Sequence, residues 1–158
     1  MPGKFALALG AALLFSSSVL LAADAPAPTA VHDSGAYKKL LGTHKLTLQW
    51  ISWDKDKAGL GTVEERNGTL YLSGEQTSRE TSDKLMVDGV ITSVSAKTFT
   101  FKGKIVTQVS YLAGGKACVR DGEYTFKITG ARKFWRMQEM DNPCDPPSVD
   151  YVDLRFDQ

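Results

Sequence analysis

The densest chemistry in this chain lies in the run RKFWR at residues 132–136, where basic and aromatic side chains alternate. A guanidinium binds carboxylates and phosphates in a bidentate geometry. Arg136 could therefore hold an anionic group of a ligand, with Trp135 beside it. It could also pair with a carboxylate of the chain itself, because Asp150 and Asp153 follow near the C-terminus and buried charges are normally paired. The sequence leaves both interpretations open.

A second group of candidate ligand contacts is aromatic. Trp50 and Tyr111 lie in segments that read as strands, and aromatic side chains there could line a sugar or lipid pocket. Aromatic residues at alternate strand positions also serve as plain core. We therefore take Arg136, Trp135, Trp50 and Tyr111 as the candidate ligand-binding residues, with the core interpretation as the alternative.

Catalytic chemistry has little support in the sequence. His32 and His44 are the only histidines, one close to the N-terminal leader and one at the start of a predicted strand. A nucleophile activated by histidine would need one of them, and no G-x-S-x-G motif is present. We predict no catalytic residue and no cofactor.

Metal binding has one partial signal. Asp54, Asp56 and Glu65 match part of the spacing of a calcium-binding loop. Ala58 stands where a third oxygen ligand would be needed, and lysines interrupt the loop. Asp, Lys and Gly are ordinary residues of a turn between strands. We therefore interpret the segment as a turn and predict no metal site.

The two cysteines, Cys118 and Cys144, are predicted to form a disulfide. An even number of cysteines in an exported chain favours a bridge. A redox pair usually has close C-x-x-C spacing, which is absent. Closing a loop of about 27 residues is worth about 3.5 kcal/mol in loop-closure entropy.

The N-terminus has the anatomy of a secretory signal peptide at residues 1–23. Lys4 precedes an apolar segment at residues 5–21, and Ala22 and Ala23 supply a small-residue exit. An uncleaved anchor is the alternative, because this segment is just long enough to span a bilayer. Residues 24–31 are rich in proline and alanine and are predicted to be a flexible leader. We expect a periplasmic or secreted protein with no membrane span after cleavage.

The whole chain carries 19 Lys and Arg against 18 Asp and Glu, a formal net charge of +1. Loss of the signal peptide removes only Lys4 among charged residues, so the two counts become equal. This balance gives no electrostatic reason to expect nucleic acid as a partner.

The elements that must position these residues are mostly strands. The only predicted helix lies within residues 32–41, with Ser34 as its N-cap. Asn67-Gly68 is a strong hairpin signal and also forms part of a glycosylation acceptor with Thr69. Predicted strands, joined by turns that include one at Gly103, occupy residues 44–53, 62–66, 69–76, 83–95, 98–102, 104–112, 122–140 (a hairpin around Gly130) and 148–156.

This pattern predicts an all-β domain over residues 32–158, namely a small antiparallel β-barrel of about eight strands with one short N-terminal helix. Closure of the sheet removes edges that would invite aggregation. Gly89, in the middle of a long strand, predicts a bulge or a sharp bend.

Two resemblances bear on this fold. Residues 37–48 (YKKLLGTHKLTL) resemble the opening of the calycins, the lipocalins and fatty-acid-binding proteins, in which a helical turn precedes a Gly-x-Trp motif. Gly42 matches the glycine, and His44 stands in place of the tryptophan. This resemblance implies an up-and-down barrel that binds a ligand. Residues 48–156, above all RKFWRMQEMDNPCD and DYVDLRF, resemble small secreted bacterial proteins of uncharacterised function. That resemblance implies export and assigns no activity.

Two functions follow as expectations. The first is a non-catalytic binding protein that holds a small, amphipathic ligand inside the barrel or at its mouth. The second is a protein–protein module, such as an inhibitor or an envelope-assembly factor, that acts through an exposed aromatic and basic surface. Exposed tryptophans would favour the second.

Overall fold

The computed structural model describes Gly3 and residues 24–157, so the predicted signal peptide, apart from Gly3, lies outside the described residues. Strands dominate the described part of the chain. Its elements are β1 (Ala30–Val31), α1 (Ser34–Leu40), β2 (Gly42–Leu48), the 3₁₀ turn η1 (Lys55–Lys57), β3 (Gly59–Arg66), β4 (Thr69–Thr77), β5 (Lys84–Val94), β6 (Thr98–Gln108), the 3₁₀ turn η2 (Ala113–Gly115), β7 (Cys118–Lys127), β8 (Phe134–Met137) and β9 (Val152–Arg155).

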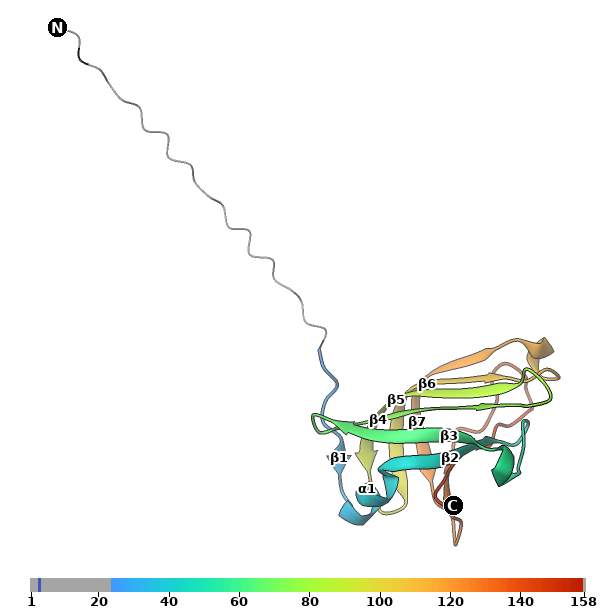
Figure 1. Ribbon diagram of the computed structural model, residues 1–158, viewed down its shortest axis with the longest axis horizontal. Coiled ribbons are helices and arrows are strands. Elements are labelled where there is room, and N and C mark those ends of the chain that lie inside the picture. The colour runs from blue at the N-terminus through green and yellow to red at the C-terminus, as the bar shows by residue number, and fades with distance from the viewer. Residues whose placement is uncertain (1–2, 4–23, 158) are drawn as a thin grey trace.

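Eight of these strands form a closed antiparallel barrel. Their order is β5–β4–β3–β2–β9–β8–β7–β6, and β6 pairs again with β5 to close the circle. In Figure 1, α1 and the β3–β4 turn lie at one end of the barrel and η1 lies at the other. The predicted barrel of about eight strands with one short helix is confirmed. No helix among the described residues is long and apolar enough to cross a membrane.

The β3–β4 connection is the two-residue hairpin that Asn67-Gly68 predicts. Arg66 pairs with Thr69 across the turn. The φ angles of Asn67 and Gly68 are 53° and 80°. This left-handed pair matches the right-handed twist of the flanking strands.

The predicted turn at Gly103 is wrong. A single strand, β6, runs through the residues where two strands, 98–102 and 104–112, are predicted, and it ends at Gln108. Gly103 lies in its middle, where it pairs with Gly89 of β5. The glycine therefore serves a close approach of two strands and not a chain reversal.

The contact at Gly89 explains why both residues are glycines. A Cβ atom on Gly89 would lie 2.4 Å from the Lys102 carbonyl oxygen and 2.7 Å from the Gly103 Cα atom. Strands this close leave no room for a side chain, so the sheet can curve sharply here. The register shift of β5 against β6 falls further on, between Ile91 and Ser93.

Part of the predicted flexible leader, residues 24–31, is docked on the barrel. The Thr29 hydroxyl donates to the Ile91 carbonyl at 2.6 Å and accepts from the Leu70 amide at 2.8 Å. β1 then pairs in parallel with the end of β5, and the Ala27 carbonyl accepts from a β4 hydroxyl. The same hydroxyl also lies 3.3 Å from the Pro26 carbonyl oxygen, so the leader is tied to the sheet from Pro26 onward.

The helix α1 packs on the core through Ala36 and Leu40, which are both buried. Its N-cap is Asp33 and not the predicted Ser34, because the Asp33 carboxylate accepts from the Ala36 amide at 2.7 Å. The His44 Nε2 atom lies 2.7 Å from the Leu40 carbonyl oxygen, which links β2 to the end of the helix.

Side chains fill the interior of the barrel. The Phe99 and Phe126 rings stack with their centres 4.8 Å apart. Trp135 lies edge-on to Phe99 at 5.8 Å and to Phe156 at 4.7 Å. The other buried apolar residues of the core are Ala36, Leu40, Leu46, Leu48, Val63, Leu70, Leu72, Leu85, Val87, Ile91, Val94, Phe101, Ile105, Val109, Ile128, Met137, Val152 and Leu154.

Candidate functional site

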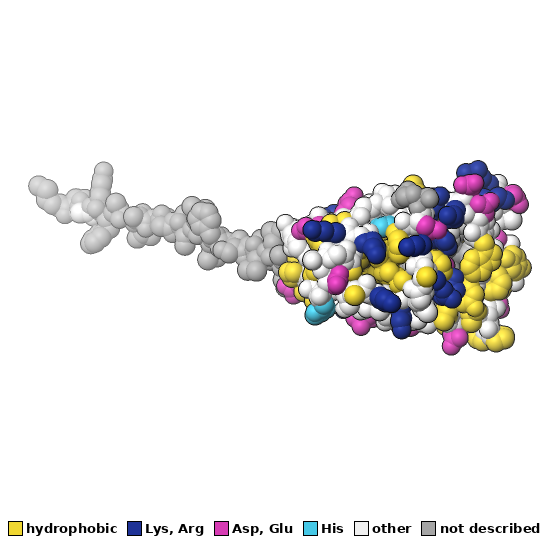
Figure 2. All heavy atoms as spheres, turned by 90° about the horizontal axis from the view of Figure 1, so that it is seen from below, with side chains coloured by type: hydrophobic (Ala, Val, Ile, Leu, Met, Phe, Trp, Pro, Cys, Tyr) yellow, Lys and Arg dark blue, Asp and Glu magenta, His cyan; other side chains and the backbone are white. Residues whose placement is uncertain are grey.

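Five side chains near β8 and β9 form a surface that we call the aromatic–basic face: Trp53, Phe134, Arg136, Tyr151 and Arg155. The Arg136 guanidinium carbon lies 4.3 Å from the Tyr151 ring centre, 5.1 Å from that of Phe134 and 5.8 Å from that of Trp53. Arg155 lies over the Phe134 ring at 4.8 Å. Figure 2 shows hydrophobic side chains gathered at one end of the molecule, with Lys and Arg side chains beside them.

Arg136 is held in place by Asp153. Its Nε and Nη2 atoms donate to the two carboxylate oxygens at 2.7 and 2.8 Å. The Asp153 side chain is fully buried, and that of Arg136 is 13% exposed. The hydrogen bonds to Asp153 raise the pKa of Arg136 above its ordinary value despite burial. Arg136 thus makes the structural pair that the sequence offers as one interpretation, on the outer face of the barrel.

The edge of the face is held by Asp157. Its carboxylate accepts from Arg155 and from Lys55, each at 3.1 Å. Burial raises the pKa of Asp157, but the hydrogen bonds from Arg155 and Lys55 outweigh it and lower the pKa below its ordinary value. Trp53, whose ring lies near Arg136 and Tyr151, is 56% exposed.

Trp135 lies in a different place from its neighbour Arg136. It is 1% exposed and packs in the core against Phe99 and Phe156. Successive strand residues point to opposite faces, so β8 buries Trp135 and presents Arg136 on the outside. Trp53 is the tryptophan that the surface displays, and it is not one of the four candidate residues that the sequence suggests.

Trp50 and Tyr111 meet at one end of the barrel. The Tyr111 hydroxyl donates to the Trp50 carbonyl at 2.9 Å, and their rings lie edge to face at 6.2 Å. Tyr111 is 62% exposed. The four candidate residues therefore occupy three places: Trp135 in the core, Arg136 on the outer face, and this pair at the barrel end.

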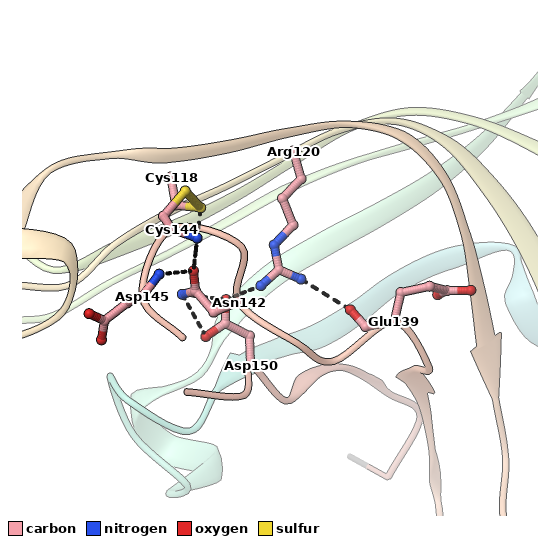
Figure 3. The surroundings of a disulfide bond; sticks show 7 residues. All are labelled: Cys118, Arg120, Glu139, Asn142, Cys144, Asp145 and Asp150. Atoms are coloured by element: carbon pink, nitrogen blue, oxygen red, sulfur yellow. Dashed lines mark hydrogen bonds and ion pairs between the residues drawn. A yellow bond between two sulfur atoms is a disulfide. The ribbon is translucent and has the colours of Figure 1, made fainter. Parts of the chain in front are cut away.

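Beneath the loop that joins β8 to β9 lies a buried ion pair that was not predicted from the sequence. Arg120 of β7 donates through Nη2 to Asp150 at 2.5 Å and through Nη1 to the Glu139 carbonyl at 3.1 Å (Figure 3). Asp150 also accepts from Trp50 Nε1 at 2.9 Å and from Asn142 Nδ2. Alternation along β7 could have placed Arg120 on the inward face.

The predicted disulfide between Cys118 and Cys144 is confirmed. It ties the start of β7 to the same loop, directly beside this ion pair (Figure 3). The Asn142 side-chain oxygen accepts from the amides of Cys144 and Asp145 at 2.8 and 3.2 Å and so shapes the turn. The loop is held by one covalent bond and by a polar network.

The segments with catalytic or metal-binding potential serve local structure. Asp54 accepts from the Asp56 amide and begins the turn η1, whereas Glu65 accepts from the Gly68 amide at the β3–β4 hairpin. Nowhere in residues 24–157 do three His, Cys, Asp or Glu side chains gather as metal ligands would. His44 is buried and His32 is exposed.

Comparison with known proteins places this barrel in a family. The model of the PM1083 family matches residues 28–156. The chain belongs to the PM1083 family. It is 48% identical over 120 residues to the uncharacterized protein PM1083 of Pasteurella multocida (strain Pm70). The aligned residues make up 75% of this chain and 74% of that protein. No solved structure matches. The resemblance to uncharacterised bacterial proteins is thereby confirmed, and the calycin resemblance is not.

Proposed function

We propose that this member of the PM1083 family is an exported, non-catalytic binding protein that recognises a protein partner through its aromatic–basic face. The observation that carries the proposal is Trp53. It is 56% exposed and lies at the end of the ordered stack of rings and guanidinium groups near β8 and β9.

The chemistry of this face is that of a protein-binding hot spot. Trp, Tyr and Arg are the residues that contribute most to binding at protein interfaces. Arg136 is already fixed by Asp153, and Tyr151 is fixed in turn because its ring packs on Arg136. A partner that docks here would lose little entropy in ordering these side chains.

The filled interior favours a surface over an internal pocket. A ligand inside the barrel would have to displace Phe99, Phe101, Phe126 or Trp135, each at most 1% exposed. Export is supported by the disulfide, because such bonds persist in oxidising compartments.

A second candidate function is supported at the barrel end. There the exposed Tyr111 ring and the half-buried Trp50 ring form an edge-to-face pair that could contact a small amphipathic ligand. A ligand bound by this pair would lie at the mouth of the barrel, which is one of the two positions expected from the sequence. Native mass spectrometry of the exported protein tests it, because a retained small molecule that Tyr111→Ala releases would support it.

The protein-partner proposal is tested with a photo-reactive amino acid placed at Trp53 in the exporting bacterium. We expect one discrete adduct with another envelope protein. The matched control places the same group at Arg66, which is exposed near the β3–β4 turn at the other end of the barrel (Figure 1). Equal adducts from both positions, or none from Trp53, would refute the proposal.

The adduct then gives a partner whose affinity can be measured. Trp53→Ala should weaken its binding about 30-fold, the effect of losing a hot-spot residue worth about 2 kcal/mol. The melting temperature should stay close to that of the wild type because the side chain is largely exposed. Unchanged affinity would place the binding site elsewhere.

A further inference from the structure

A row of mostly apolar side chains crosses the outer wall of the barrel at β3–β7. Leu60, Met86 and Val119 are 60%, 42% and 58% exposed. The strand registers put them in one line, because Leu60 pairs with Glu75, Glu75 with Met86, Met86 with Val106, and Val106 with Val119. Glu75 of β4 is the one charged member of this row, which is apolar on β3, β5, β6 and β7. Outward positions of a barrel in water are usually polar, so apolar side chains on four strands at one height mark an interaction surface.

A groove of about 570 Å³ lies on this part of the wall and is lined by residues of β3, β4, β5 and β6. Leu60, Glu75, Met86 and Val106 of the row are among its lining residues. Val119 is not among the groove residues. It stands two strands beyond Met86, on β7. The wall thus carries a hollow and a projecting apolar side chain at the same height along the strands.

The next outward row along the strands is charged. Asp88 of β5 pairs with Lys104 of β6, and Lys104 pairs with Asp121 of β7. The signs therefore alternate from strand to strand. A surface of this kind is complementary to itself when it is turned over.

We propose that the β5–β6 wall is the interface of a symmetric dimer whose two-fold axis runs along the strands between β5 and β6. Rotation about this axis keeps each row opposite the same row and puts β5 opposite β6 of the second copy. Met86 then faces Val106 of the second copy, and Asp88 faces Lys104 of the second copy. β4 faces β7 of the second copy, so the β4 part of each groove, at Glu75, receives the other copy's Val119.

This dimer does not depend on the function proposed for the aromatic–basic face. In the closed order of eight strands, β2 and β9 lie opposite the β5–β6 pair. The aromatic–basic face, on β8 and β9, therefore stays free. Self-association is measured with the purified chain alone, so its failure would leave the crosslinking result at Trp53 unaffected.

The test uses charge variants of the purified, disulfide-intact chain in analytical ultracentrifugation. The wild type should sediment as a dimer. Asp88→Lys and Lys104→Asp should each raise the dimer dissociation constant at least about tenfold, because each places two like-charged pairs in the interface. A mixture of the two variants should form mixed dimers, because each contact between positions 88 and 104 across the axis then joins one lysine to one aspartate.

Mixing the two variants distinguishes a contact between two copies from an ion pair between positions 88 and 104 within one chain. Asp88 and Lys104 are also cross-strand neighbours in a single barrel, and mixing cannot restore that pairing. Lys97→Asp, on the turn after β5, changes the charge as Lys104→Asp does and is the control. It should leave the wild-type dimer intact and should not pair preferentially with Asp88→Lys.

Several outcomes would overturn the proposal. They are a monomeric wild type at millimolar concentration, a dimer that neither charge variant weakens, and a mixture that stays monomeric. If a charge variant melts early, Val119→Ser supplies the test, because this residue is exposed and its loss should weaken the dimer without affecting the fold.

Discussion

Replacing Asp150 by alanine should destabilise the protein more than any change at the surface. The carboxylate is fully buried and accepts hydrogen bonds from Arg120, Trp50 and Asn142. Without it, Arg120, whose side chain is 5% exposed, keeps only its bond to the Glu139 carbonyl. An uncompensated buried charge costs about 3–5 kcal/mol. For a urea dependence of about 2 kcal/mol per molar, the midpoint should fall by about 2 M.

The assay is urea unfolding followed by tryptophan fluorescence, with a double variant to isolate the pair. Arg120→Met with Asp150→Leu should recover part of the loss, because it removes the uncompensated charge, whereas Trp50 Nε1 and Asn142 Nδ2 still lack their acceptor. Asp121→Ala, an exposed carboxylate next to Arg120, is the control and should change the free energy of unfolding by no more than about 0.5 kcal/mol. A loss below about 1 kcal/mol for Asp150→Ala, or a double variant no more stable than Asp150→Ala, would contradict the reasoning.

Three further predictions concern stability. Cys144→Ser should lower the free energy of unfolding by about 3.5 kcal/mol through lost loop closure. Urea unfolding of the wild type with and without a dithiol reductant should give the same difference, and identical unfolding curves would contradict this prediction. Gly89→Ala should lower the free energy of unfolding by about 1–3 kcal/mol because the new Cβ atom meets the backbone of β6. Gly122→Ala should lower it less, because a Cβ atom there meets only the end of a tyrosine side chain at 3.4 Å. Calorimetry compares the stabilities of the two variants, and a larger loss for Gly122→Ala would be evidence against the close approach of β5 and β6. Thr29→Val should cost about 1–3 kcal/mol because two buried backbone groups lose their partner, and amide hydrogen exchange should quicken where β1 meets the barrel; unchanged exchange there would be inconsistent with the docking.

Local signals in the sequence were enough to predict the barrel. Asn67-Gly68 specifies its hairpin because both residues must adopt positive φ. The disulfide was predicted from two cysteines in a chain for which the sequence also predicts export. Alternation identifies strands whatever their neighbours are, which is why the fold class could be predicted without the strand order.

Features that depend on distant partners could not be predicted. Gly103 looks like a turn residue, and only its pairing with Gly89 shows that it lies inside a strand. Trp53 and Trp135 have the same chemistry in sequence. One is exposed and the other buried because β8 faces inward at Trp135. The role of Arg120 depends on the β8–β9 loop, which folds over it and supplies Asp150.

The docking of β1 on the barrel also bears on when the predicted signal peptide could be cleaved. Among residues 24–157, the first hydrogen bond to the barrel is made by the Pro26 carbonyl, so Asp24 and Ala25 separate the predicted cleavage site from the docked segment. Two extended residues span about 7 Å. Cleavage after Ala23, as the sequence predicts, would therefore have to take place almost against the barrel surface. If the chain is cleaved there, processing is expected to come before β1 pairs with β5.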